Sequence, residues 1–246
     1  LGGVCLNWGC IPTKALLKSA QVFEYLNRAE DYGLNAENVS KDFNKIIDRS
    51  RNVAKGMSKG VNFLMKKNKI DVLTGYGKIK KEKIVSVDGN DYKASHVIIA
   101  TGSRSRTIDS IPQDGNQIIG YREAMTLKKQ PKSITIVGSG AIGIEFAYFY
   151  NSIGTNVNIV EYMPNIVPLE DEDVSKELAK SFKKKGINIL TSSEVISVKK
   201  IKNKVIATIK KNDEETNLES EILLSAVGIK SNIENIGLED VGIAVD

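Results

Sequence analysis

The chain has 246 residues, of which 41% are hydrophobic and 26% are charged, a balance typical of an ordinary globular protein. No apolar run approaches the roughly 20 residues that a membrane-spanning helix needs, and no signal peptide is visible, so we expect neither a membrane span nor secretion. The net charge of +5 comes from dispersed lysines rather than from a basic stripe with interleaved aromatic residues, which argues against nucleic-acid binding.

The first feature along the chain is a pair of cysteines, Cys5 and Cys10, the only two in the sequence. Pro12 follows them and indicates the first turn of a helix, which we expect to continue over residues 13–28. The pair could be a structural disulfide, part of a metal site, two free core thiols or a redox disulfide. No metal is expected, because a closed zinc or iron–sulfur site needs about four soft ligands and the chain adds only one histidine.

The position of Cys10 favours redox chemistry. It lies at the N-terminus of the predicted helix, where the helix dipole stabilises a thiolate, and Lys14 adds positive charge nearby. A disulfide that closes so short a loop would be strained and therefore easily reduced. As a purely structural bond it would contribute only roughly 2 kcal/mol, and a chain of this length buries a core without it. Two free thiols remain the alternative.

The next elements follow from hydrophobic spacing. Apolar residues at helical intervals predict a long helix over residues 42–67. Residues 71–87 alternate like strands, and an Asp-Gly pair at 88–89 indicates a hairpin turn. An apolar run at 96–100 predicts a buried strand that ends before a Thr-Gly pair. We interpret the histidine in this run as a strand residue rather than a catalyst, because its neighbours are apolar and no Ser or Cys nucleophile lies near it in sequence.

A Gly-rich turn at residues 138–143 is the strongest nucleotide-binding signal. A β-branched strand precedes it and a helical run over 141–152 follows, which is the context that a dinucleotide-binding turn requires. Gly138 permits a tight turn, Gly140 lets the backbone approach a pyrophosphate, and Gly143 lets helix and strand pack closely. The pyrophosphate would lie at the helix N-terminus.

A second strand over residues 156–160 ends in Glu161, close to the spacing expected for an acid that binds a ribose. A carboxylate there accepts a hydrogen bond from a ribose 2′-hydroxyl and repels a 2′-phosphate. Since no Arg or Lys occurs at residues 162–168, we predict NAD(H) rather than NADP(H). The unit is completed by an amphipathic helix over 172–185 and by strands near 195–198, 205–209 and 222–227.

Residues 5–14, which read Cys-Leu-Asn-Trp-Gly-Cys-Ile-Pro-Thr-Lys, closely resemble the active-site signature of the flavin-dependent pyridine nucleotide–disulfide oxidoreductases. Within this family the run is most similar to the NAD-dependent enzymes that reoxidise dihydrolipoamide in 2-oxo acid dehydrogenase complexes. The resemblance implies a redox disulfide in which Cys5 exchanges with the substrate and Cys10 faces FAD, which passes hydride to NAD⁺. The alternatives are another flavin disulfide reductase, such as mercuric or glutathione reductase, and a catalytically incomplete nucleotide-binding fragment.

The same resemblance assigns further residues. It implies that Lys14 and Glu145 form a buried pair beside the nicotinamide and the flavin. It places Thr101 and Gly102 against FAD, and Gly228 where the NAD domain closes. FAD and NAD are the implied cofactors, and dihydrolipoamide on an acyltransferase carrier domain is the implied partner. The intact enzyme would be a homodimer in the cytoplasm or the mitochondrial matrix.

The expected fold is α/β, with a Rossmann-like three-layer NAD-binding domain inserted in an incomplete FAD-binding domain. We assign residues 1–111 to the incomplete FAD-binding domain with the redox disulfide, residues 112–232 to the NAD-binding domain, and residues 233–246 to a return to the FAD or central domain. Only the second unit has its Gly-rich turn, so the chain is expected to cover roughly half of an intact enzyme.

Overall fold

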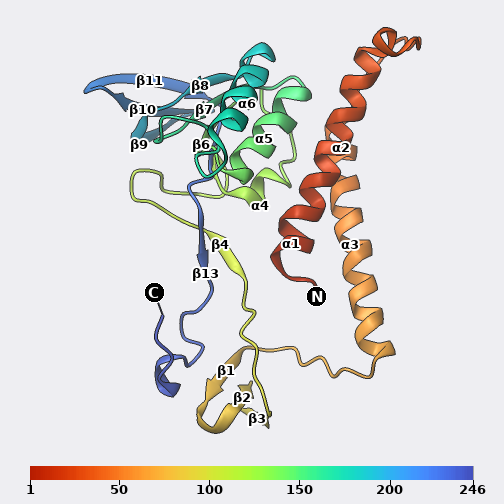
Figure 1. Ribbon diagram of the computed structural model, residues 1–246, viewed down its shortest axis with the longest axis vertical. Helices are drawn as coiled ribbons and strands as arrows, with labels where there is room; N and C mark the ends of the chain where they lie inside the picture. Colours follow the sequence, from red (N-terminus) through yellow and green to blue (C-terminus); the bar gives the residue numbers. More distant parts are fainter. Residues whose placement is uncertain (246) are drawn as a thin grey trace.

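The computed structural model describes residues 1–245 and shows an elongated molecule with two long helices along one side (Figure 1). These helices run antiparallel, and a sheet unit lies beside one part of them (Figure 1). The chain begins with α1 (Gly3–Trp8), α2 (Cys10–Asn27), a short 3-10 turn η1 (Ala29–Tyr32) and α3 (Phe43–Lys67).

The predicted helix over residues 42–67 is confirmed as α3, and its ends have clear causes. The side chain of Asp42 accepts a hydrogen bond from the backbone N–H of Lys45 over 3.1 Å, which caps the N-terminus. Lys66 and Lys67 lie in the last turn, where positive charge favours the negative end of the helix dipole. The helix α2 begins earlier than the predicted residue 13, at Cys10 itself.

A five-stranded parallel sheet forms the centre of the second unit, with strand order β5-β12-β6-β7-β8. Residues 141–152 form the helix α5 and residues 156–160 form the strand β7, as predicted. The Rossmann-like α/β fold is therefore confirmed. The strands are β5 (Ile118–Ile119), β6 (Ser133–Val137), β7 (Asn156–Val160), β8 (Asn188–Leu190) and β12 (Ile222–Ser225).

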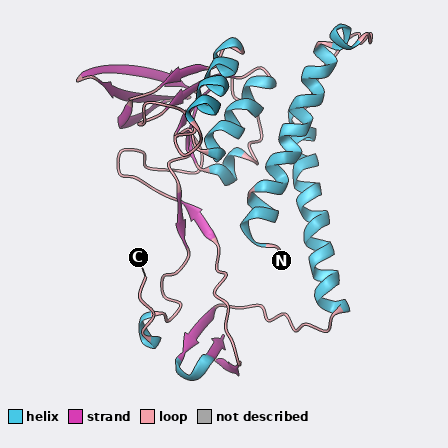
Figure 2. Cartoon of the chain, in the orientation of Figure 1, coloured by secondary structure: helices cyan, strands magenta, loops and turns pink. Residues whose placement is uncertain are grey.

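Three layers make up this unit (Figure 2). The helices α5 (Ala141–Ser152) and α6 (Glu172–Lys184) cover one face of the parallel sheet, and an antiparallel meander covers the other. Alternate residues of β6 divide between the layers: Ile136 packs against α5, whereas Val137 packs toward the meander. The meander consists of β9 (Glu194–Ile201), β10 (Lys204–Lys211) and β11 (Glu214–Ser220), of which the last is not predicted by the sequence.

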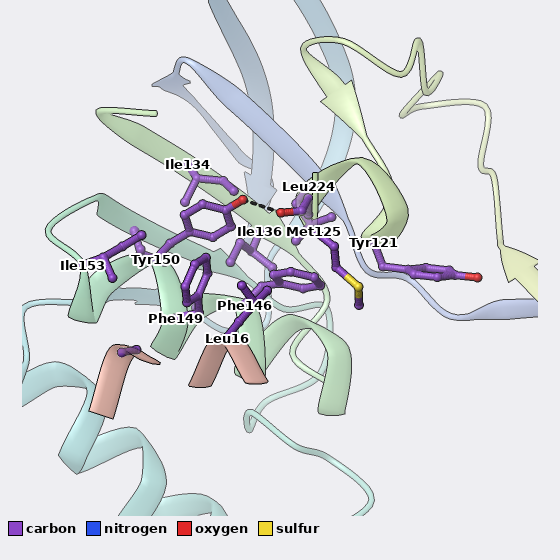
Figure 3. Packing of buried hydrophobic residues seen from close by; sticks show 14 of the residues in the cluster. Leu16, Tyr121, Met125, Ile134, Ile136, Phe146, Phe149, Tyr150, Ile153 and Leu224 are labelled. Carbon is purple, nitrogen blue, oxygen red and sulfur yellow. Dashed lines mark hydrogen bonds between the residues drawn. The ribbon is translucent and has the colours of Figure 1, made fainter. Parts of the chain in front are cut away.

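Aromatic side chains from α5 form the centre of the larger core (Figure 3). Phe149 and Tyr150 are fully buried, and the Tyr150 hydroxyl donates a hydrogen bond to the carbonyl of Ala124 over 2.7 Å. That carbonyl belongs to α4 (Tyr121–Ala124). Leu16 from α2 is also fully buried in this cluster. The helix that begins at Cys10 therefore packs directly against the unit built on the parallel sheet.

A small antiparallel sheet lies apart from the parallel sheet (Figure 1). The predicted hairpin turn is confirmed, because Asp88 and Gly89 have positive φ angles of 47° and 88° and join two paired strands. The prediction of strands from residue 71 is wrong for residues 71–76, which form none. The sheet consists of β1 (Gly77–Lys80), β2 (Ile84–Val87) and β3 (Asn90–Lys93), with η2 (Lys81–Lys83) between the first two.

The buried strand predicted at residues 96–100 is not present. This segment is extended without strand pairing, and Ile98 is 89% exposed. A strand needs a neighbour to pair with its backbone N–H and C=O groups, and no segment within residues 1–245 pairs with this one. Apolar composition alone therefore does not make it a core strand here.

A two-stranded antiparallel ladder connects the parts (Figure 1). It consists of β4 (Ser103–Ser105) and β13 (Ile229–Ser231), and the turn η3 (Glu239–Val241) follows. The predicted domain boundaries stay predictions, and Asp246, the last residue of the third segment, lies outside the described residues. Among the helices of residues 1–245, none combines the length and apolar character required to cross a membrane.

Candidate functional site

The two thiols lie close together at the junction of α1 and α2. Cys5 lies in α1, Cys10 is the first residue of α2, and both are exposed free thiols that line one cavity. Gly9 between the helices allows this approach, because a Cβ there would lie 3.0 Å from the Cα of Cys5. The pair is thus arranged at a helix start as predicted, and its oxidation to a disulfide remains a prediction.

The charge state of Cys10 differs from the sequence-based expectation. The pKa of Cys10 is raised, first by its hydrogen bond with Cys5, then by burial and by the charge that a second thiolate would carry. A hydrogen bond to its own backbone and the charge of Lys14 act to lower the pKa, but they do not prevail. The pKa of Cys10 in the reduced pair is therefore raised rather than lowered, and its role as a reactive thiolate stays a prediction.

Lys14 and Glu145 form an ion pair between α2 and α5. The prediction that these distant residues approach each other is confirmed. The pair is not buried, however: the side chains of Lys14 and Glu145 are 65% and 25% exposed. An ion pair with this exposure contributes on the order of 0–1 kcal/mol, so its position matters more than its contribution to stability.

A cavity of about 440 Å³ is lined by residues of α1, α2 and α5, and both thiols are part of its lining. Its size is within the range of small-molecule and cofactor sites. Most of the lining is apolar, and the charged groups are confined to the Lys14–Glu145 pair. The residues that line it include Cys5, Cys10, Trp8, Ile142 and Phe146.

The three glycines of the Gly-rich turn occupy three different environments. Gly138 has a φ of 96°, and a Cβ there would lie 2.5 Å from the carbonyl oxygen of Ala226. A Cβ on Gly143 would lie 2.0 Å from the carbonyl oxygen of Gly138, so only glycine lets α5 pack this closely. Gly140 caps α5 and a Cβ there would meet nothing within 4 Å. Open space at the N-terminus of a helix fits a pyrophosphate.

Glu161 lies at the end of β7, directly beside this turn. Its side chain is held by the chain itself: Oε2 accepts hydrogen bonds from the backbone N–H and the hydroxyl of Ser139, and Oε1 accepts one from the backbone N–H of Met163. The residue is only 7% exposed. The structure therefore brings the predicted ribose-binding acid and the predicted pyrophosphate turn together. The contact with Ser139 is not predicted by the sequence.

The remaining predicted site residues meet at the β4–β13 ladder. Asn232 donates its backbone N–H to the carbonyl of Gly102 over 2.9 Å and its side-chain amide to the carbonyl of Thr101 over 3.2 Å. The carbonyl of Gly228 accepts a hydrogen bond from the backbone N–H of Arg106 over 3.0 Å. A Cβ on Gly102 would lie 3.3 Å from a methyl group of Val4, so this junction lies beside α1.

The sequence of residues 1–246 matches the family of pyridine nucleotide-disulphide oxidoreductases. The chain belongs to this family. Dihydrolipoyl dehydrogenase from Rhizobium etli is 42% identical over 268 residues, which are 100% of this chain and 56% of that protein. Dihydrolipoyl dehydrogenase from Zymomonas mobilis is 43% identical over 252 residues, which are 100% of this chain and 54% of that protein.

Solved structures of the same class superpose on this disulphide oxidoreductase chain. LpdA from Mycobacterium tuberculosis gives a TM-score of 0.91 at 26% identity, covering 100% of this chain and 55% of that one. RclA from Escherichia coli, an HOCl-induced flavoprotein disulfide reductase, gives 0.81 at 26% identity, covering 100% and 52%. The chain spans about half the length of the curated relatives it matches.

Two groups of residues in this oxidoreductase chain are not predicted by the sequence. The guanidinium groups of Arg51 and Arg122 lie 4.2 and 5.6 Å from the ring centroid of Trp8, so cation–π contacts join α1 to α3 and α4. Burial lowers the pKa of Arg51. Such contacts join segments far apart in sequence, and the spacing of residues within a single helix carries no signal for them.

The second group joins α2 to α5 through Glu24. Its carboxylate accepts hydrogen bonds from the hydroxyls of Tyr148 over 3.0 Å and Ser152 over 2.8 Å, and it pairs with Lys185. Burial acts to raise the pKa of Glu24, but the hydrogen bonds from these three residues outweigh it and lower the pKa. Burial and the bond to Glu24 raise the pKa of Tyr148 to about 12.

Proposed function

We propose that the protein containing this chain is an NAD-dependent dihydrolipoyl dehydrogenase. Its substrate would be dihydrolipoamide on the acyltransferase carrier domain of a 2-oxo acid dehydrogenase complex. The observation that carries this proposal is the paired thiols of Cys5 and Cys10 in one cavity with the Lys14–Glu145 pair. The similarity to dihydrolipoyl dehydrogenases of Rhizobium etli and Zymomonas mobilis supports lipoamide as the substrate.

The thiol chemistry would use the two cysteines in different roles. In the oxidised protein, one thiol of dihydrolipoamide would attack Cys5 and break the Cys5–Cys10 bond. The second substrate thiol would then displace Cys5, so that the substrate leaves as a disulfide and both cysteines are left reduced. Two electrons and two protons pass from substrate to protein in this exchange. The position of both cysteines in the lining of one cavity supports this exchange, because a substrate that enters the cavity can reach either sulfur.

The residues present fit both implied cofactors to different extents. The apolar cavity beside Cys10 suits the ring of FAD, which when bound supplies the two-electron and hydride chemistry that links the thiols to NAD⁺. Thr101 and Gly102 would hold FAD at the junction beside α1. Lys14 and Glu145, on the side of the cavity formed by α2 and α5, would set the charge beside the nicotinamide and the flavin.

The Gly-rich turn would hold NAD. The backbone at Gly138, Gly140 and Gly143 would bind the pyrophosphate, and Glu161 would accept a hydrogen bond from the ribose. Gly228 would close the nucleotide site from the next strand end. We also propose a homodimer located in the cytoplasm or the mitochondrial matrix, as the family resemblance implies.

The test compares electron donors and acceptors in the purified full-length protein. We expect a yellow flavoprotein that reduces lipoamide with NADH at least about tenfold faster than it reduces glutathione disulfide or uses NADPH. Cys10→Ser should abolish lipoamide reduction while NADH binding persists. Faster turnover with glutathione and NADPH would favour the other reductases. A colourless protein that binds NADH without turnover would support a nucleotide-binding fragment instead.

A further inference from the structure

Ser139, between the first two glycines of the Gly-rich turn, is fully buried and bonded through all three of its polar groups. Its backbone N–H and its hydroxyl donate to Oε2 of Glu161 over 2.8 and 2.6 Å. Its carbonyl accepts a hydrogen bond from the backbone N–H of Val167 over 3.1 Å. A residue held at N–H, side chain and C=O cannot turn, so Ser139 is a fixed point in the turn.

The loop after β7 is also held at this point. Val167 has a φ of 42°, in the left-handed region that β-branched residues rarely adopt. Its N–H is bonded to Ser139, and its carbonyl accepts a hydrogen bond from the hydroxyl of Ser175 over 3.3 Å. A strained conformation persists only where its surroundings over-determine it. The loop after Glu161 is therefore tied to Ser139, and the strand before Glu161 is tied to the neighbouring Gly138, whose backbone N–H donates to the carbonyl of Val160 over 2.8 Å.

The carboxylate of Glu161 has little acceptor capacity left. A carboxylate offers about four acceptor positions, two on each oxygen. Ser139 takes both positions on Oε2, and the backbone N–H of Met163 takes one on Oε1 over 2.8 Å. No other donor within residues 1–245 bonds to this carboxylate. One position on Oε1 therefore remains for a ligand.

We propose that Ser139 is the positioning residue for nicotinamide-nucleotide selectivity, because its hydroxyl fixes the Glu161 carboxylate and leaves only Oε1 for the ribose 2′-hydroxyl. This inference rests on the proposed function and deepens its account of the NAD site. Ser139 acts through Glu161 and has no contact of its own to the ribose.

Fixing the carboxylate matters more for rejecting NADPH than for binding NADH. A 2′-hydroxyl donates its proton to Oε1, whereas a 2′-phosphate carries negative charge and meets a carboxylate that cannot swing aside. Without the Ser139 hydroxyl, Oε2 keeps only one hydrogen bond, and Glu161 can rotate away from a phosphate. The loss of the Ser139 hydroxyl should therefore reduce the selectivity for NADH over NADPH. The ribose 2′-hydroxyl of NADH then meets a less well oriented acceptor, and the 2′-phosphate of NADPH no longer meets a carboxylate held in place.

The experiment measures the Kd of the chain for NADH and for NADPH by the fluorescence of the reduced nicotinamide. In Ser139→Ala we expect the Kd for NADPH divided by the Kd for NADH to fall about fivefold to tenfold, the net size of one typical intramolecular hydrogen bond. Thr135→Val is the matched control. It removes a buried hydroxyl that has no hydrogen-bond partner among residues 1–245, on the strand before the turn, and should leave the ratio unchanged.

Each outcome decides the proposal. An unchanged ratio in Ser139→Ala, or an equal loss of affinity for both nucleotides, overturns it, because a merely structural role would weaken both alike. If Ser139→Ala does not fold by circular dichroism, Ser139→Gly removes the same hydroxyl, keeps the backbone N–H and decides in its place. A wild-type chain that binds neither nucleotide, or that prefers NADPH, overturns the NAD assignment of the proposed function as well.

Discussion

Gly143 provides the sharpest test of how the Gly-rich turn works. A Cβ at this position would lie 2.0 Å from the carbonyl oxygen of Gly138 and 3.0 Å from its carbonyl carbon. Gly138 cannot retreat freely, because the space on its own Cβ side is filled by the carbonyl of Ala226 at 2.5 Å. The clash in Gly143→Ala is therefore between the added Cβ and a backbone carbonyl, and neither has a rotamer that could relieve it.

The magnitude follows from this geometry. Overpacking in a filled interior costs about 1–3 kcal/mol, and a clash that moves backbone on both sides belongs at the upper end of this range. We expect Gly143→Ala to lower the free energy of unfolding by about 3 kcal/mol, which shows as a lower urea midpoint followed by far-ultraviolet circular dichroism.

Gly140→Ala is the matched control, three residues earlier in the same turn. Its φ of −67° and ψ of −177° suit any residue, and a Cβ there meets nothing within 4 Å. The expected change in stability is below about 1 kcal/mol, the cost of alanine at a helix N-cap. The added methyl group would occupy the space of the pyrophosphate, so NADH affinity should fall at least about tenfold.

Two results would refute this account of the turn. If Gly143→Ala has the same urea midpoint as the wild type, the close packing of α5 against the turn does not depend on glycine at this position. If Gly140→Ala binds NADH with wild-type affinity, the open space above the helix N-terminus is not the pyrophosphate site.

Two further predictions use the perturbed groups. The folded pKa of Glu24 lies below its ordinary value of 4.5, so Glu24 stabilises the fold above that pH and this contribution is lost as the pH falls through the folded pKa. Glu24→Gln, which removes the charge facing Lys185, should therefore lower the neutral-pH urea midpoint and reduce the loss of stability in acid; identical acid profiles would contradict this. In the reduced chain, Cys5→Ala removes the largest cause of the raised pKa of Cys10, so iodoacetamide should alkylate Cys10 faster at neutral pH, and a slower rate would contradict it.

The Gly-rich turn could be predicted closely from the sequence because its requirements are local. The strand before it, the helix over residues 141–152 and the strand over 156–160 are all confirmed. Contacts within the turn and with the segment beside it leave no space for a Cβ at Gly138 or Gly143. The presence of glycine at these positions was therefore enough to predict the turn. The approach of Lys14 to Glu145 was also predicted, but through the family resemblance rather than through spacing.

The predictions that failed concern features that depend on other segments of the chain or on the direction of a neighbouring side chain. The run at 96–100 has strand composition but no pairing partner in the described part of the chain. The raised pKa of Cys10 depends on the direction in which the thiol of Cys5 points, which the spacing of two cysteines does not determine. Likewise, the bond from Ser139 to Glu161 crosses between two strand ends and has no signal in either segment.

The helices α2 and α5 carry the two halves of the candidate site, and they are joined at two separate points. One is the Lys14–Glu145 pair, and the other is the bond between Glu24 and Ser152. The contact points lie about 15 Å apart along α2 and about 10 Å apart along α5, from the rise of a helix, and they occur in the same order on both helices. Leu16 fills the core between them. Two joints and a packed centre fix both the separation and the relative direction of the helices. Because Cys10 begins α2 and the Gly-rich turn precedes α5, this helix pair fixes where the thiol cavity lies relative to the turn.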